Sequence, residues 1–133
     1  RLGVEIVATL PCNGTHLDRC LRGSQYDRVL VDAPCSNTGV MRRRPDLRWR
    51  LAATEIGRLA ALQLQLLRSA ATFVRPGGRL VYSTCSLERE ENEDVVAAFV
   101  ADQAGLEPET TRALFPPEAG MDGAFVAVFR RAN

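Results

Sequence analysis

The chain has 133 residues, of which 46% are hydrophobic and 25% are charged. These proportions are those of an ordinary folded domain, so they exclude wholesale disorder. No apolar run reaches the roughly 18 residues of a membrane span, so we expect no membrane partner. The net charge is only +1, but residues 1–79 hold 13 arginines and 6 acidic residues, whereas residues 80–133 hold 4 and 10. The basic half could face a polyanion, or it could reflect ordinary solvated helix surfaces.

The first half of the chain predicts two strands separated by turns. Residues 4–8 alternate in hydropathy and favour a strand, and residues 11–25 are rich in turn-forming residues. Residues 26–31 form a short apolar run, which predicts a strand buried on both faces, as in a parallel sheet. Residues 36–50 contain Gly39, Pro45 and five arginines, and they predict a loop.

The second half predicts helices alternating with strands. Apolar residues at steps of three and four predict a helix that Thr54 caps and that ends at residues 76–78, Pro-Gly-Gly. A strand over residues 79–83 follows, then a helix capped by Ser86 and ended by Gly105. A final strand covers residues 124–129. This alternation predicts an α/β protein with a mostly parallel sheet.

Four cysteines lie at positions 12, 20, 35 and 85, and none of them forms a C-x-x-C pair. We therefore expect free thiols in a reducing compartment, the cytoplasm. Cys12, His16 and Cys20 stand at four-residue steps and could share one face of a helix. A regular helix is doubtful beside Pro11, and a fourth ligand is missing, so we predict no metal site.

Cys35 and Cys85 each follow a predicted strand, and a single crossover helix joins the two strands. Strands connected in this way are usually neighbours, and chemistry in parallel sheets gathers at their carboxyl ends. The two cysteines are therefore candidates for one cleft. The alternative is that both are structural residues of the core, where cysteine is common.

Residues 32–40, Asp-Ala-Pro-Cys-Ser-Asn-Thr-Gly-Val, and residues 77–86, Gly-Gly-Arg-Leu-Val-Tyr-Ser-Thr-Cys-Ser, together resemble the signature segments of one family. Residues 43–46, 90–93 and 122–125 add to the likeness. The family is the Sun-type RNA 5-methylcytosine methyltransferases, which use S-adenosylmethionine. The resemblance implies a partial Rossmann-like methyltransferase fold with a C-terminal antiparallel strand. It also implies that residues 1–133 are the C-terminal portion of one catalytic domain that acts on RNA, ribosomal RNA in the bacterial members.

The resemblance also implies roles for individual residues. Cys85 would add to C6 of cytosine and make C5 reactive, which is covalent catalysis. Cys35 would assist release of the methylated product. Asp32 would lie near the cofactor and the base, where it could support protonation at N3, and Pro34 would help to bind the cofactor. The amide groups of the helix after Cys85 should favour its thiolate, whereas the glutamates there oppose it, so we expect activation to need the substrate and Asp32 as well.

The densest basic stretch follows Cys35 directly. Its arginines Arg42, Arg43, Arg44 and Arg48 would lie near the mouth of the cleft, so we predict that they contact RNA. The alternative is a surface loop of solvated charges with Trp49 tucked into the core.

Two features of the family are missing from this sequence. No glycine-rich loop of the cofactor-binding type precedes residue 39, and no acid stands near Asn13, where the family holds the adenine. We therefore expect the isolated chain to bind S-adenosylmethionine weakly and to be inactive. It would be a fragment of a longer enzyme or a truncated gene product, and its exposed sheet edges would favour a homodimer or a strand swap.

Three other functions compete with RNA methylation. The chain could be a non-catalytic RNA-binding or assembly module that keeps the arginine stretch. A DNA cytosine methyltransferase is disfavoured, because its attacking cysteine lies in a Pro-Cys segment and here a second cysteine follows the next strand. A thiol hydrolase is disfavoured because His16 is the only histidine.

Overall fold

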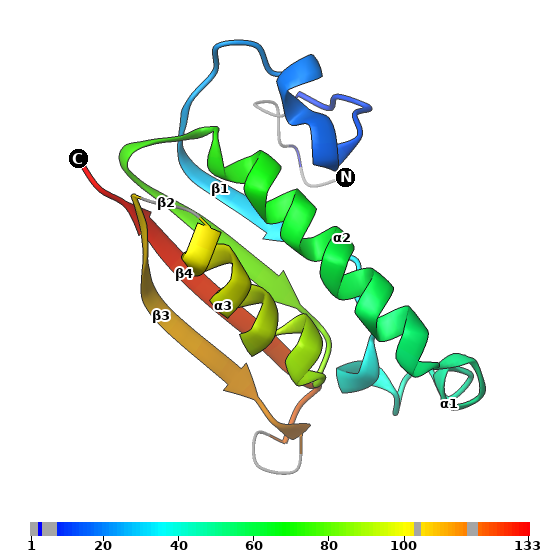
Figure 1. Ribbon diagram of the computed structural model, residues 1–133. Helices are drawn as coiled ribbons and strands as arrows, with labels where there is room; N and C mark the ends of the chain where they lie inside the picture. The colour runs from blue at the N-terminus through cyan, green and yellow to red at the C-terminus, as the bar shows by residue number, and fades with distance from the viewer. Residues whose placement is uncertain (1–2, 4–7, 103–104, 117–119) are drawn as a thin grey trace.

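The computed structural model describes residue 3 and residues 8–102, 105–116 and 120–133. A sheet in the strand order β1-β2-β4-β3 forms one layer of the molecule (Figure 1). Strands β1 and β2 are parallel, and β4 is antiparallel to both of its neighbours, so β1, β2 and β3 run in one direction against β4. This confirms the predicted α/β class and the antiparallel final strand. The elements are η1 (Gly14–Arg19), β1 (Tyr26–Asp32), η2 (Thr38–Val40), α1 (Leu47–Arg50), α2 (Ala53–Ala71), β2 (Val74–Thr84), η3 (Arg89–Glu91), α3 (Glu93–Asp102), β3 (Leu106–Leu114) and β4 (Ala124–Arg131).

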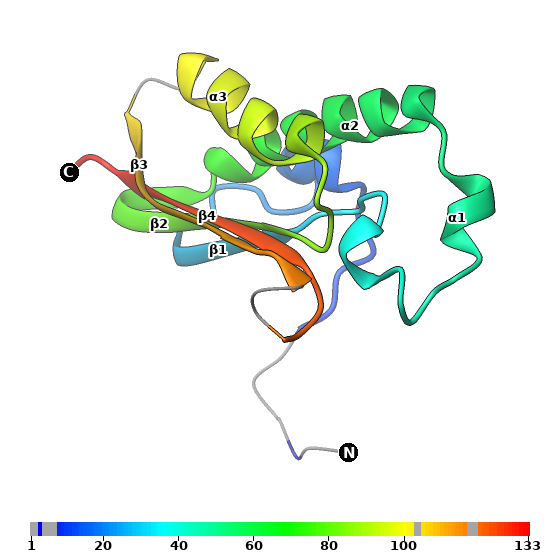
Figure 2. The ribbon, with the colours of Figure 1, turned by 90° about the horizontal axis from the view of Figure 1, so that it is seen from below.

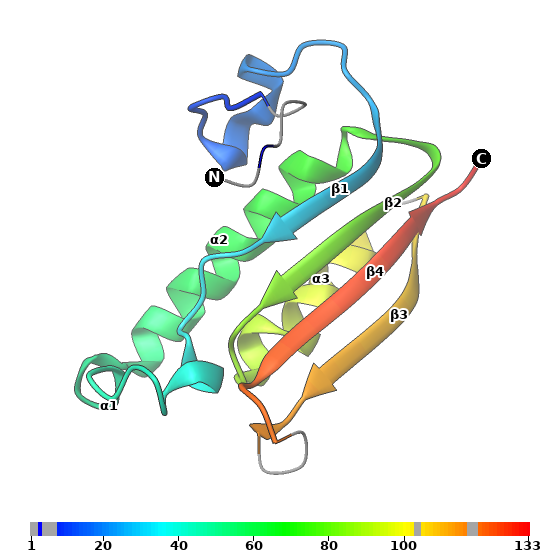
Figure 3. The same ribbon diagram turned by 180° about the vertical axis from the view of Figure 1, so that it is seen from behind.

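The molecule has two layers, because α2 and α3 lie on the same face of the sheet (Figure 2). The opposite face carries no helix among the described residues (Figure 3). The core fills the space between helices and sheet, where Phe99 of α3 meets Phe129 of β4 with ring centroids 4.9 Å apart. No helix in the described ranges combines the length and apolarity that crossing a bilayer would demand.

Strand β1 differs from the expected strand buried on both faces. Val29 and Val31 are half-buried and pack against the core, but Leu30 is 66% exposed. Successive side chains of a strand point to opposite faces. Leu30 therefore points to the face that the described helices leave uncovered.

The first long helix forms where its periodicity predicts it, but both of its ends are shifted. It begins at Ala53 after Ala52, so Thr54 is not its cap. It ends at Ala71, because the chain already enters β2 at Val74. The Pro-Gly-Gly turn at residues 76–78 lies inside that strand, with Gly77 at a φ of 71°, and the pairing with β1 shifts its register there.

The segment after β2 also differs from the expectation. Ser86 does not begin a long helix: the short η3 comes first and α3 starts only at Glu93. The sequence did not predict β3, since most of its residues are exposed and show no alternation. The strand predicted over residues 4–8 lies for residues 4–7 outside the described residues.

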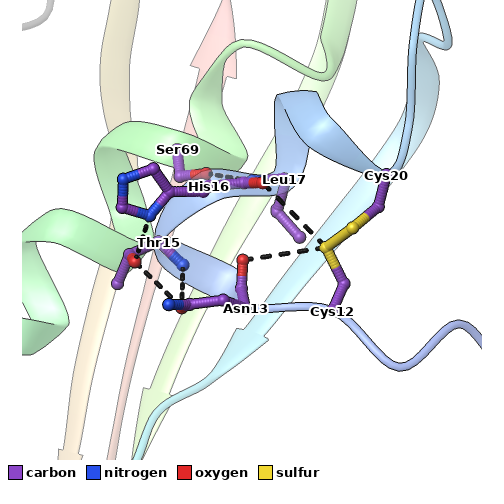
Figure 4. The surroundings of a disulfide bond; sticks show 7 residues. All are labelled: Cys12, Asn13, Thr15, His16, Leu17, Cys20 and Ser69. Carbon is purple, nitrogen blue, oxygen red and sulfur yellow. Dashed lines mark hydrogen bonds between the residues drawn. A yellow bond between two sulfur atoms is a disulfide. The ribbon is translucent and has the colours of Figure 1, made fainter.

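Cys12 and Cys20 form a disulfide around η1 (Figure 4), which corrects the expectation of free thiols at these positions. The segment is not a regular α-helix, because η1 is a 3-10 helix with non-helical torsion angles at His16. The side-chain oxygen of Asn13 caps it by accepting from the amide of Thr15 at 3.0 Å. The kinked turn brings the two sulfur atoms together across η1.

Candidate active site

The parallel strands β1 and β2 end side by side, with Asp32 in register with Ser83. The amide of Ala33 donates to the carbonyl of Ser83 at 2.9 Å, and Ser83 Oγ donates to Asp32 Oδ1 at 2.8 Å. The segments that follow the two strands therefore both leave the sheet at the carboxyl ends of β1 and β2. Active sites of parallel sheets usually lie at these strand ends.

The structure brings Cys35 and Cys85 together at the carboxyl ends of β1 and β2. Their Sγ atoms are 3.3 Å apart, although 50 positions separate them in the sequence. Cys35 is buried and Cys85 is half-buried, and neither forms a disulfide. Asp32, at the end of β1, lines the same pocket as Cys85. The structure therefore brings the two cysteines together as expected and places Asp32 at a pocket that it shares with Cys85.

Asn37 joins the two cysteines through its side-chain amide. Its Nδ2 donates to the carbonyl of Cys35 at 2.7 Å, and its Oδ1 accepts from Cys85 Sγ at 3.0 Å. The backbone of Asn37 is left-handed, with a φ of 62°, a conformation that asparagine tolerates better than most residues. The sequence analysis missed this residue, and its only signal was an asparagine two positions after Cys35.

The Cys85 thiol is held in its protonated form. Burial raises its pKa to about 12, and the hydrogen bond with Cys35, the charge on Cys35 and the nearby Asp32 carboxylate act in the same direction. The helix expected directly after Cys85 begins only at Glu93, and the backbone hydrogen bond that lowers the pKa of Cys85 is outweighed by burial. The dominant effect at this thiol is desolvation.

A buried carboxylate lies beneath the two cysteine segments. Glu91 of η3 is fully buried, and it accepts from the amide of Ser36 at 3.0 Å and from Ser86 Oγ at 2.6 Å. Gln63 of α2 is also fully buried, and its Nε2 donates to Glu91 at 2.9 Å. Residues 90–93 counted toward the family resemblance, and the glutamates after Cys85 were expected to oppose its thiolate, but no contact of Glu91 with the cysteine segments was predicted.

A third segment of the chain, just before β4, contacts the cysteine segments through the pair Gly39 and Gly123. The amide of Gly39 donates to the carbonyl of Cys85 at 2.9 Å, and the amide of Gly123 donates to the carbonyl of Gly39 at 2.8 Å. A Cβ atom at Gly39 would lie 2.5 Å from the oxygen of Gly123. Only glycine allows this approach, which links the cysteine segments to the start of β4.

Two pockets meet at Asp32. The first, of about 610 Å³, is lined by Asp32, Cys85 and residues of β2, β3 and β4, including Arg112 and Phe125. The second, of about 460 Å³, has a mostly apolar lining from β1, η1 and α2, and it includes Asp32, Pro34 and Asn13. One carboxylate therefore borders a hollow with the half-buried thiol and a hollow without it.

The second pocket offers a partial fit to S-adenosylmethionine. Asp32 and Pro34, both expected at the cofactor, share its lining. Asn13, which stands where the family's adenine-binding acid is missing, also lines it, but its side-chain oxygen is used to cap η1. The pocket therefore offers a carboxylate and apolar surface, without a free acid or amide oxygen at the position of Asn13.

The arginine stretch is partly tied to the same edge of the molecule. Arg42 Nε lies 2.6 Å and Arg43 Nε 2.7 Å from the carboxylate of Asp122. Because Asp122 directly precedes Gly123, these ion pairs hold the stretch beside the site. They also neutralise part of the positive charge that was predicted to contact RNA.

Arg44 and Arg48 are exposed, and no ion pair of either is found among the described residues. Trp49 on α1 is 90% exposed, so the alternative in which it tucks into the core is wrong. An exposed indole beside arginines is an arrangement that can stack on unpaired bases.

The family described as "16S rRNA methyltransferase RsmB/F" matches residues 1–130 of the chain. The chain belongs to this RsmB/F family. This membership confirms the resemblance to the Sun-type methyltransferases that the two cysteine segments indicated.

Several RsmB/F relatives match most of the chain. The "Ribosomal RNA small subunit methyltransferase B" of Thermus thermophilus is 45% identical over 117 residues, which cover 80% of this chain and 29% of the relative. The "Probable ribosomal RNA small subunit methyltransferase B" of Bacillus subtilis is 41% identical over 109 residues, covering 82% and 24%. The chain thus spans about a quarter to a third of the length of these relatives.

Solved structures carry the same fold. NSun6 from Pyrococcus horikoshii, solved with the S-adenosylmethionine analogue SFG, superposes with a TM-score of 0.87 at 29% identity, covering 99% of this chain and 36% of that protein. A methyltransferase homologue from the same organism gives a TM-score of 0.74 at 27% identity, covering 90% and 43%.

Proposed function

We propose that this chain is the C-terminal portion of a catalytic domain that transfers a methyl group from S-adenosylmethionine to C5 of cytosine in RNA, with small-subunit ribosomal RNA as the substrate. The observation that carries the proposal is the contact between Cys35 and Cys85, 3.3 Å apart at the strand ends, with Asp32 beside them. Membership of the RsmB/F family and the names of the relatives support the substrate class.

The two thiols would divide the reaction between them. Cys85 Sγ, the half-buried sulfur that lines a pocket, forms a bond to C6 of the base, and C5 becomes nucleophilic. Once C5 carries the methyl group, its proton passes to water, the C5–C6 double bond re-forms, and the bond between Cys85 and C6 breaks with the thiolate as leaving group. Cys35, in contact with Cys85, assists this release.

Asp32 couples the base to the thiol. Its carboxylate can share a proton with N3 of the base, which favours attack at C6. Cytosine arrives without a proton at N3, so this proton comes from the Cys85 thiol and passes through Asp32 to N3 as the sulfur adds to C6.

Asp32 and Pro34 would contribute to the cofactor site in the 460 Å³ pocket. S-adenosylmethionine supplies the methyl group when bound. The apolar lining from β1 and α2 would exclude water there. The exposed Arg44, Arg48 and Trp49 would contact RNA, with Arg42 and Arg43 held beside them by Asp122.

Ribosomal RNA as substrate favours the cytoplasm as the place of action. The Cys12–Cys20 disulfide is the observation against it, since disulfides are rare in reducing compartments.

Covalent trapping tests the reaction. The complete gene product that contains these residues is incubated with labelled S-adenosylmethionine and RNA bearing 5-fluorocytosine, whose C5 cannot release a proton. We expect a covalent adduct at Cys85, found by peptide mapping. Cys85→Ala should abolish the adduct, and Cys35→Ala with ordinary RNA should let it accumulate.

The same experiment separates the enzyme from a non-catalytic RNA-binding module. A module would retain RNA but give no adduct in the unchanged protein. An adduct yield that neither substitution changes would show that the cysteine roles are assigned wrongly.

We also propose that residues 1–133 alone bind S-adenosylmethionine weakly and are inactive, because their sequence has no glycine-rich loop of the cofactor-binding type before residue 39. The outer edge of β1, which pairs with no strand in the described ranges, would favour a homodimer or strand swap of the isolated chain. Titration calorimetry should detect no binding at micromolar cofactor, and a micromolar dissociation constant would contradict this expectation.

A further inference from the structure

A single buried carboxylate contacts both cysteine segments, in addition to the direct hydrogen bonds of Asn37 and Gly39 with Cys85. Besides the amide of Ser36 and Ser86 Oγ, Glu91 accepts from Ser36 Oγ, so that it contacts the residue directly after each cysteine. The two serine hydroxyls are themselves 3.0 Å apart. One side chain thus connects the segment that follows β1 with the segment that follows β2.

The cost of burying this carboxylate is offset by hydrogen bonds alone. Burial of a charged group is expensive unless several donors compensate it. Gln63 supplies a further donor from α2, and its Nε2 also donates to the carbonyl of Pro34 at 2.9 Å. None of the ion pairs found in the described ranges includes Glu91. A group of this kind contributes through the geometry that it fixes.

The backbone around Glu91 is anchored without its carboxylate. Tyr82 Oη donates to the carbonyl of Glu91 at 2.6 Å. The next residue, Asn92, accepts from Thr84 Oγ1 at 2.6 Å and donates to the carbonyl of Ser86 at 2.9 Å. A substitution at the Glu91 side chain therefore removes its hydrogen bonds to Ser36 and Ser86 but keeps the anchors of η3, and the direct contacts of Asn37 and Gly39 with Cys85 remain.

We propose that Glu91 is a positioning residue of the methyl transfer: through Ser36 and Ser86 it holds the Cys35 and Cys85 sulfurs at the spacing at which both can act on one base. This inference rests on the proposed function. Misplacement of a reacting group by about 1 Å can lower a rate by roughly two orders of magnitude, so a link that sets sulfur spacing affects the chemical step.

The spacing of the sulfurs can be measured without any methyl transfer. In a glutathione redox buffer, the two thiols react with glutathione disulfide to give one protein disulfide and two glutathione molecules. The equilibrium constant is the effective concentration of one thiol at the other. Mass spectrometry of the Cys35 and Cys85 peptides reports it for the complete gene product, separately from the Cys12–Cys20 pair.

Glu91→Leu, which has no acceptor, should lower this effective concentration by about tenfold or more and lower kcat with little change in KM for RNA. Glu91→Gln should rescue both values to within roughly threefold, because its oxygen can accept from the Ser36 amide while its amide donates to the serine hydroxyls. The matched controls are Glu90→Leu and Glu90→Gln, since Glu90 is the exposed neighbour. These controls should match the unchanged protein.

A folded Glu91→Leu protein with unchanged effective concentration and kcat would overturn the proposal. If Glu91→Leu does not fold, Ser36→Ala decides, because it removes a hydroxyl that contacts only Glu91 and Ser86. It should lower both values, and values equal to those of the unchanged protein would overturn the inference. If the unchanged protein shows the expected thiol exchange but never forms an RNA adduct, this result would instead count against the proposed function.

Discussion

The thiol of Cys85 is held in its protonated form. Burial, the neighbouring Cys35 and the Asp32 carboxylate all raise its pKa. A thiol of this kind reacts slowly with adventitious electrophiles, because the thiolate is the nucleophile. Under the proposed function, attack at C6 would therefore need an acceptor for the thiol proton.

Alkylation of Cys85 by iodoacetamide should follow this suppression. With the pKa raised to about 12, the rate should keep rising through pH 9 and 10 without reaching a plateau. Cys35→Ser and Asp32→Asn should each raise the rate at pH 8, the former more, since Cys35 contributes more to the shift. Peptide mapping over a pH series measures the rate, and a plateau below pH 8 would contradict the expectation.

At the scale of single residues, some site residues could be predicted from the sequence and others could not. The motif segments placed Cys35, Cys85 and Asp32 correctly at one edge, because strand ends follow from the hydropathy pattern. Glu91 was counted only as a motif residue and as one of the glutamates that oppose the Cys85 thiolate. Its burial depends on donors from two distant residues, Ser36 and Gln63, and on the nearby Ser86, and no local pattern records them.

At the scale of elements, the loop after β1 owes its shape to close backbone approach. Gly39 stands between the carbonyl oxygens of Cys85 and Gly123, which a Cβ atom would meet at 2.8 Å and 2.5 Å. Backbone oxygens cannot rotate away as a flexible side chain can. The chain must therefore shift if this residue gains a side chain.

Gly39→Ala should destabilise the protein by about 1–3 kcal/mol, as expected for overpacking, and should reduce adduct formation by displacing Cys85. The control is Gly57→Ala within α2, where no atom lies within 4 Å of the new Cβ. That substitution should stabilise the helix by about 0.5–1 kcal/mol. Urea unfolding measures both, and equal effects at the two positions would refute the packing argument.

Elements with strong periodicity were predictable, and weakly patterned ones were not. Helix α2 and strand β4 lie within a few residues of their predicted bounds because each buries one face. Strand β3 shows no alternation because it lies at the edge of the sheet and pairs only with β4. The Pro-Gly-Gly segment at residues 76–78 was taken as a helix end, but the helix stops earlier and β2 contains the turn.

At the scale of the molecule, ion pairs between the two halves of the chain cancel part of its uneven charge distribution. Several arginines of the basic half pair with acids of the other half: Arg42 and Arg43 with Asp122, Arg68 with Asp102, and Arg79 with Glu109. Exposed pairs of this kind contribute only about 0–1 kcal/mol each to stability. Their main effect is to decide which arginines remain available to a polyanion.

Arg44 and Arg48 should therefore carry more of the RNA contact than Arg42 and Arg43. Each phosphate contact to a single strand contributes about 0.7 to the slope of log K against log salt. Arg44→Ala and Arg48→Ala should each lower the slope by roughly that amount, whereas Arg42→Ala should lower it less. Fluorescence anisotropy with a single-stranded RNA over a salt series measures the slopes in the complete gene product.

Trp49 provides a readout that is independent of charge. Trp49→Ala should weaken binding by about 1–3 kcal/mol through lost stacking and leave the salt slope unchanged. The control for both effects is Arg79→Ala, because Arg79 pairs with Glu109 far from the carboxyl end of β2. If Arg79→Ala lowers the salt slope as much as Arg44→Ala does, the RNA is bound by the overall charge of the chain and not by the arginine stretch beside Cys35.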